Sequence, residues 1–241
     1  MLKSQEKTLI LYVYNDLTSV HLALIRDGLL VERVSLSSRQ FNTHFFPLLD
    51  EIFIHQACKL DDCTAFAVSA GPAPFTTLRS ILATINTFAW MLQKPVYAVH
   101  GLYANIFGAI DTGKPQKGDL ICTCVHAFCG DMYYAYVLYD GLQDNIADAT
   151  VEMCALVSFE KEFCRITQHV QNIWVCGNAF GIEEDLVVLQ KVLADKRVCY
   201  LDVEKSCLEM VVKIIEGSSE PLVIKTNQAE PLYIKPPFCA M

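Results

Sequence analysis

The sequence predicts an α/β protein of two lobes that share one fold. Strand-like and helix-like periodicities alternate along the chain, and each half opens with an antiparallel strand hairpin. A polar stretch that contains Gly and Lys separates the two halves at residues 111–118. With 241 residues, of which 53% are hydrophobic, the chain can bury one large core or two smaller ones.

The first half reads as a three-strand meander followed by alternating helices and strands. Period-two alternation predicts strands at 8–14, 20–25 and 30–36, with an Asp27-Gly28 turn between the last two. Apolar runs and helical spacing predict the later elements, which are a helix at 41–57, a strand at 65–69, a helix at 75–92, a strand at 96–99 and a helix at 102–109.

The second half repeats this theme, although no residue-level repeat is visible. Its expected elements are a hairpin of strands 120–125 and 132–139, a strand at 173–176, and helices at 182–193 and 204–216. The polar stretch between the halves predicts one lobe at 1–108 and a second at 118–241. The helix at 204–216 is free to pack back on the first lobe.

Composition argues against several classes of protein. A net charge of −8 without any Lys/Arg cluster disfavours direct binding of nucleic acid. The apolar stretches are interrupted every few residues and the first residues lack an apolar signal core, so we expect a cytoplasmic protein that does not enter the membrane. Eleven cysteines without a C-x-x-C pair predict reduced, buried thiols, with Cys122 and Cys124 on one strand face.

The turn after the first strand has the position of a phosphate site but not its residues. Such a turn uses a carboxylate for hydrated magnesium, a glycine for close backbone approach and a hydroxyl for phosphate. Here Asn15 lacks the charge, Asp16 comes one residue late and Leu17 fills space before Thr18. A simple Asx-type turn in a hairpin is the other interpretation of this segment.

The stretch Gly71-Pro72-Ala73-Pro74 forms a second degenerate turn, at the start of the helix 75–92. Turn amides and a helix N-terminus favour an anion, but no glycine follows Gly71 to let a phosphate approach the backbone. Pro74 suits the first helical position, with Ala73 as the cap residue. We therefore expect the isolated chain to bind no cofactor.

Residues 71–79, Gly-Pro-Ala-Pro-Phe-Thr-Thr-Leu-Arg, resemble the G-P-G-S-F-T-G-L-R signature of the bacterial TsaB (YeaZ) family at six of nine positions. Other family segments have counterparts in the same order at 9–15, 19–24, 44–49, 127–133 and 229–235. The resemblance implies the duplicated, two-lobed fold of actin, hexokinase and Hsp70 (ASKHA), with mixed sheets. Asn15, His126 and Phe128 depart from the family pattern.

Members of this family are non-catalytic partners of TsaD in making threonylcarbamoyladenosine on tRNA. The resemblance thus implies an accessory subunit that binds a TsaD-like catalytic subunit. It also implies a TsaE-like ATPase as a further partner, only indirect contact with tRNA, and ATP or ADP only at the interface of the complex. A homodimer through the same helices, and a diverged ATPase or small-molecule kinase of the same fold, remain open alternatives.

The resemblance implies that the helices at 41–57 and 75–92 form the partner-binding surface. Small residues lie mostly off the apolar stripe of the second helix, while bulky residues sweep a wide arc of the first. The candidate partner-binding residues are Phe45, Leu49, Phe53, Thr76, Arg79, Ser80, Ala83, Thr84 and Thr87. Burial within the same lobe is the alternative explanation for the wide arc.

Sequence motifs for catalysis are absent. The six histidines are scattered, and the chain contains no H-x-x-x-H, G-x-S-x-G, P-loop or G-x-G-x-x-G motif. We therefore predict no catalytic residues and no metal site, as in a non-catalytic subunit.

Overall fold

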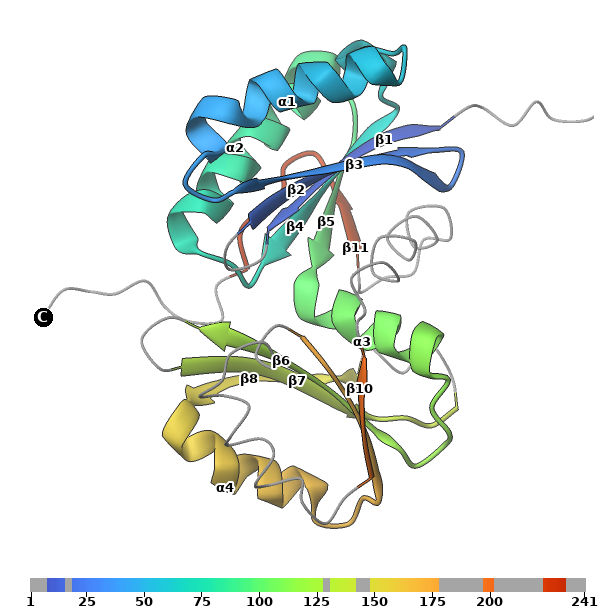
Figure 1. Cartoon of the computed structure of the whole chain (residues 1–241), viewed down its shortest axis with the longest axis vertical. Helices are drawn as coiled ribbons and strands as arrows, with labels where there is room; N and C mark the ends of the chain where they lie inside the picture. The colour runs from blue at the N-terminus through green and yellow to red at the C-terminus, as the bar shows by residue number, and fades with distance from the viewer. Residues whose placement is uncertain are drawn as a thin grey trace, which may run out of the picture. The chain divides into compact units, whose positions relative to one another are not determined.

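The structure is a computed structural model that describes residues 8–15, 19–127, 131–141, 148–177, 197–201 and 223–232 (Figure 1). The described residues divide into two compact units, each with its own β-sheet. Residues 8–99 and 223–231 form the first unit, and the remaining described residues form the second. The helices expected at 182–193 and 204–216 lie outside the described residues.

A six-stranded mixed sheet, in the order β11-β5-β4-β1-β2-β3, forms the centre of the first unit. Its strands are β1 (Leu9–Asn15), β2 (Ser19–Arg26), β3 (Leu29–Ser37), β4 (Ala65–Gly71), β5 (Val96–His100) and β11 (Val223–Thr226). The first three strands form the predicted antiparallel meander, and β4 runs parallel to β1. The sequence did not predict β11, which pairs antiparallel with β5.

Helices α1 (Phe41–His55) and α2 (Phe75–Leu92) cover the same face of this sheet (Figure 1). Both bury residues at spacings of three and four, as the predicted amphipathic pattern requires. The buried residues of α2 are Leu78, Ile81, Leu82, Ile85, Phe88 and Ala89. They form one core with the inner residues of α1 and of the central strands.

The second unit repeats the sheet of the first. Its order is β10-β9-β6-β7-β8, with strands β6 (Leu120–Ala127), β7 (Asp131–Leu138), β8 (Thr150–Ala155), β9 (Asn172–Cys176) and β10 (Arg197–Leu201). The strands β6 to β8 form an antiparallel meander and β9 is parallel to β6, as β4 is to β1. This correspondence confirms the predicted duplicated α/β fold.

Two helices cover opposite faces of the second sheet. Phe159 and Phe163 of α4 (Leu156–Thr167) pack with Cys122 and Cys124 of β6, while α3 (Gly101–Gly113) contacts the other face. On α3, Asn105 Nδ2 donates a hydrogen bond to Thr123 Oγ1 of β6 at 3.1 Å.

The sequence-based boundary of the first lobe, at residue 108, is therefore misplaced. Helix α3 contacts β6, β7, β9 and β10, and the first compact unit ends at Val99. The polar loop after Gly113 marks the end of α3 and not the junction of the units. No helix among the described residues is both long enough and apolar enough to span a bilayer.

Asp119, at the start of β6, joins the loop after α3 to β9. Its carboxylate accepts hydrogen bonds from the backbone N–H of Gln116, from Asn172 Nδ2 and from Trp174 Nε1, at 2.9, 2.8 and 2.8 Å. Burial alone would raise the pKa of Asp119, but the three hydrogen bonds outweigh it and lower the pKa below its ordinary value.

Candidate functional site

The first degenerate turn begins with a buried and uncharged side chain. Asn15 ends β1, pairs with Val20 and is 7% exposed. Neither its Oδ1 nor its Nδ2 has a hydrogen-bond partner among the described residues. A neutral carboxamide is a weaker ligand for hydrated magnesium than a carboxylate. Asp16, Leu17 and Thr18 lie outside the described residues.

The second degenerate turn offers few backbone donors. Gly71 has φ of 117° and its N–H donates to Ser69 Oγ at 3.4 Å, while Pro72 and Pro74 have no N–H. The cap residue of α2 is Pro74 and not Ala73, because Pro74 has non-helical backbone angles (φ −55°, ψ 124°) and its carbonyl accepts from Leu78 N–H. The turn therefore starts a helix but presents little for an anion to bind.

Gly177, which directly follows β9, has a packing role. Its φ is 105°, and a Cβ at this position would lie 2.2 Å from the carbonyl oxygen of Cys124 on β6. Only glycine fits this close approach of two backbones. This close packing accounts for a glycine at position 177.

Three of the predicted partner-binding residues belong to the core and not to the surface. Phe45, Leu49 and Phe53 of α1 are 2%, 3% and 6% exposed, and they pack against the sheet and α2. The wide apolar arc of α1 therefore has two parts. Its inner part is buried, whereas Phe46 and Ile54 are 56% and 74% exposed.

The small residues of α2 do reach the surface. Thr76, Arg79, Ala83 and Thr87 are exposed, and Ser80 and Thr84 are half-buried. At about 100° per residue, these side chains lie on the side of the helix opposite to its buried stripe. The structure thus brings them together on one strip, as the sequence predicts.

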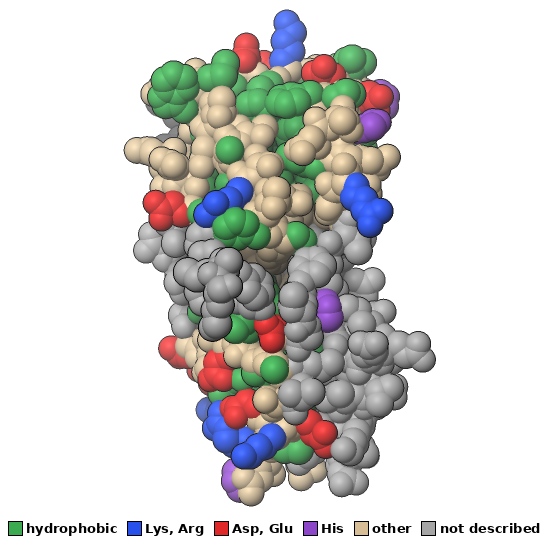
Figure 2. Space-filling view, turned by 90° about the vertical axis from the view of Figure 1, so that its left-hand side faces the viewer, with side chains coloured by type: hydrophobic (Ala, Val, Ile, Leu, Met, Phe, Trp, Pro, Cys, Tyr) green, Lys and Arg blue, Asp and Glu red, His purple; other side chains and the backbone are tan. Residues whose placement is uncertain are grey.

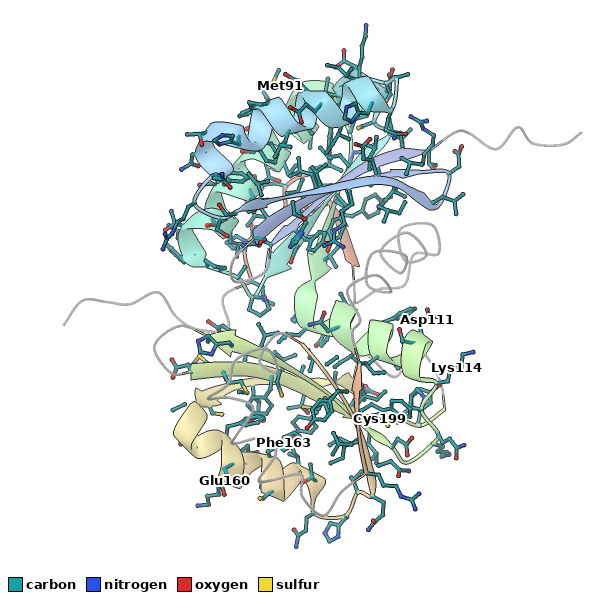
Figure 3. All side chains as sticks on the ribbon, viewed as in Figure 1. Met91, Asp111, Lys114, Glu160, Phe163 and Cys199 are labelled. Carbon is teal, nitrogen blue, oxygen red and sulfur yellow. The ribbon has the colours of Figure 1, made fainter. Side chains whose placement is uncertain are left out.

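Sequence reasoning missed two large residues at the C-terminal end of the same strip. Trp90 is 74% exposed, and Met91, which is labelled in Figure 3, is 65% exposed. Trp90 follows Thr87 by three residues, so extending the helical spacing by one step would have found it. We define the α1–α2 outer surface by its exposed residues Phe46, Ile54, Thr76, Arg79, Ala83, Thr87, Trp90 and Met91.

Three of the four hydroxyl groups on this strip are already hydrogen-bonded within the helix. Ser80 donates to Thr76 O at 3.1 Å, Thr84 to Ser80 O at 2.9 Å and Thr87 to Ala83 O at 2.7 Å. A second helix can therefore approach without stripping water from these three hydroxyl donors.

The α2 strip carries one charged side chain, Arg79, while the exposed Asp50 lies on α1, one turn from both Phe46 and Ile54. At the start of α2, the Arg79 guanidinium lies 3.9 Å from the centre of the Phe75 ring, a cation–π contact that keeps Arg79 close to the helix. Figure 2 shows hydrophobic side chains among uncharged polar ones on one side of the first unit, with most charged side chains towards the margin of that area. Surfaces of this kind are typical of protein–protein contacts.

The thiols and histidines that the structure describes form no comparable site. The Sγ atoms of Cys122 and Cys124 lie 3.7 Å apart in the core of the second unit, and burial raises the pKa of Cys124. Burial lowers the pKa of His100 to about 4. Among the described residues, no three His, Cys, Asp or Glu side chains are grouped so that they could hold a metal ion.

Two solved structures share the fold. YeaZ from Pseudomonas aeruginosa has a TM-score of 0.61 and 15% identity, over 93% of this chain and all of that chain. A second P. aeruginosa protein, described as similar to peptidase YeaZ, has a TM-score of 0.61 and 16% identity, over 95% of this chain and all of that one. The two-lobed fold expected from the sequence is therefore confirmed.

The family is shown by the sequence itself. The model of the TsaD family, described as tRNA N6-adenosine threonylcarbamoyltransferase, matches residues 35–224, and the chain belongs to this family. A curated tRNA N6-adenosine threonylcarbamoyltransferase from Persephonella marina is 27% identical over 79 residues. This match spans 33% of the chain but only 23% of that relative.

Proposed function

We propose that this protein is an accessory subunit that binds and supports a catalytic TsaD-type subunit in forming threonylcarbamoyladenosine on tRNA. The observation that carries the proposal is the α1–α2 outer surface, where large apolar side chains border a strip of small residues. Membership of the TsaD family and a fold shared with YeaZ support the proposal that this surface acts in tRNA modification. In this role the protein contacts tRNA only through its partner and works in the cytoplasm.

The shape of the strip favours a helix as the element that the partner contributes. Thr76, Ala83 and Thr87 have short side chains, so the backbones of two helices can come close over them. Trp90 and Met91 at one end of the strip, and Phe46 on α1, provide the bulky anchors on which binding energy concentrates. Phe46 is placed next to α2 by its contact with Phe88, at 6.2 Å between ring centres.

We also propose that catalysis and nucleotide binding reside outside the isolated chain. Asn15 supplies no charge for magnesium, and the turn 71–74 offers few N–H donors to a phosphate. ATP or ADP would then bind only at the interface with the partner, where a TsaE-like ATPase can act. A homodimer through the same surface would compete with the partner.

Reconstitution tests the proposal. The full chain, mixed with the TsaD-type protein of the same organism and the other components of the pathway, is expected to co-purify with it and to raise tRNA threonylcarbamoylation above the level without the chain. If the chain does not co-purify with that protein and does not raise tRNA modification, the proposal is contradicted. Phosphorylation of a small molecule by the chain alone would favour the kinase alternative.

A further inference from the structure

One carboxamide on α2 holds a distant part of the chain through both of its polar atoms. Asn86 Oδ1 accepts the backbone N–H of Ala229 at 2.8 Å, and Asn86 Nδ2 donates to the Ala229 carbonyl at 2.9 Å. The two residues are 143 positions apart. The side chain thus satisfies both backbone groups of one residue, as a neighbouring strand would.

The segment that Asn86 holds is also fixed just before Ala229. Before it, Thr226 ends β11, and its Oγ1 donates to Gln228 O at 3.0 Å and accepts Gln228 N–H at 3.2 Å. Ala229 itself is 3% exposed and belongs to the core of the first unit. Asn227, Gln228 and Glu230 are exposed, so in the segment 227–230 every side chain except that of Ala229 faces solvent.

Asn86 lies between the buried stripe and the exposed strip of α2. At about 100° per residue, it is about 60° from Ala83 and about 40° from Trp90 around the helix. Its half-buried position agrees with this placement. The segment that it binds therefore runs along the flank of the strip, beside the residues that we assign to the partner.

We propose that residues 227–230 are a third element of the partner-binding surface, with Asn86 as the positioning residue that holds them beside α2. The inference rests on the proposed function and names more of the same interface. The strip itself is nearly uncharged, whereas Glu230 adds an exposed carboxylate at its edge. The partner is thus a catalytic TsaD-type subunit that presents a Lys or Arg to Glu230, next to the apolar contact.

The first test separates the pair of Asn86–Ala229 hydrogen bonds, here called the clamp, from the partner interface. Asn86→Ala is expected to speed hydrogen exchange of the Ala229 amide by about tenfold or more, because this N–H loses its acceptor. It should also weaken binding of the TsaD-type subunit by about tenfold while the amides of β1 and β4 stay protected. Asn105→Ala, which removes a carboxamide contact in the second unit, is the matched control and should change neither value.

The second test does not depend on the clamp. Glu230→Lys leaves the fold intact, since the side chain is exposed, and should lower affinity by about threefold to tenfold at low salt and less at high salt. Asp61→Lys makes the same charge change at an exposed position between α1 and β4 and should have little effect.

The outcomes distinguish the two proposals. If Ala83→Arg abolishes binding but Asn86→Ala and Glu230→Lys do not weaken it, residues 227–230 lie outside the interface and this inference is wrong. If none of the three variants weakens binding, the proposed α1–α2 interface is wrong as well. An unchanged Ala229 amide in Asn86→Ala would overturn the clamp itself.

Discussion

Single residues explain why this chain keeps the frame of a phosphate-binding fold without its ligand groups. Asn15 puts a neutral, buried carboxamide where the first turn starts, and prolines at 72 and 74 remove two N–H groups from the second. Gly177 is fixed by its distance to Cys124 O. Each residue was visible in the sequence, but only the structure shows that Asn15 is buried and that Gly177 faces a strand.

The isolated protein is expected not to bind Mg-ATP in the micromolar range. Asn15 cannot hold hydrated magnesium as a carboxylate would, and the turn 71–74 has few donors for phosphate. Isothermal titration of the purified monomer measures this. A micromolar dissociation constant would contradict the prediction and support the kinase alternative.

Replacing Asn15 by leucine is expected to leave the protein as stable as the wild type or to stabilise it by about 1 kcal/mol. The buried Asn15 amide has no hydrogen-bond partner among the described residues, which costs free energy in the folded state, and leucine has a similar branched shape without polar atoms. Urea unfolding measures the change in the free energy of unfolding. Asn15→Asp is expected to lower that free energy, because it buries a charge. A loss of more than about 2 kcal/mol in Asn15→Leu would show that the amide has a partner.

At the scale of elements, the strength of the local pattern decided what the sequence could predict. The meander β1–β3 and helices α1 and α2 have long, regular periodicities and were found. The short strands β8, β10 and β11 were not, because strands of four to six residues with mixed polarity resemble loops. Helix α4 was also missed, although its Phe159 and Phe163 are four residues apart and buried.

Burial explains the errors at the candidate site. Bulky residues on α1 are equally consistent with a core and with an interface, since both exclude water. Phe45 and Phe46 are adjacent, yet only the position of the sheet makes the first 2% and the second 56% exposed. The strip on α2 was predicted better because Thr76, Ala83 and Thr87 lie opposite a clear apolar stripe.

Trp90 is expected to be the main anchor of the α1–α2 outer surface. Trp90→Ala should weaken binding of the TsaD-type subunit by about 30-fold or more, the cost typical of a buried interface tryptophan, without lowering the melting temperature. Surface plasmon resonance measures the affinity. Leu29→Ala, at an exposed apolar residue of the β2–β3 hairpin, is the control and should bind normally. Equal binding by both variants would place the anchor elsewhere.

The Asp119 cluster makes the second unit sensitive to acid. Because the pKa of Asp119 is lowered in the folded state, its contribution is complete above the ordinary value of 3.8 and is lost as pH falls through the folded pKa. Asp119→Asn should therefore reduce the unfolding free energy by about 1–3 kcal/mol at pH 7 and flatten its fall below pH 4. Urea unfolding across pH tests both, and parallel pH curves for the two proteins would contradict the assignment.

On the scale of the whole molecule, the five-stranded sheet of the second unit repeats the order of the first sheet, which has β11 as an additional edge strand. The sequence indicated the duplication through its restart after residue 118, but it placed α3 in the wrong lobe. The polar composition of residues 111–118 indicates where helix α3 ends, but it does not indicate on which sheet the helix packs. The return of β11 to the first sheet was also beyond local patterns, because it pairs residues more than 120 positions apart.

The most direct test of the central claim is the affinity of the chain for its TsaD-type subunit when the centre of the strip is charged. Ala83→Arg and Thr87→Glu are expected to remain folded, with an unchanged melting temperature, but to lose binding and tRNA threonylcarbamoylation in the reconstituted assay. Leu29→Glu, an equally exposed charge outside the surface, should behave like the wild type. Full binding by both α2 variants would contradict the account.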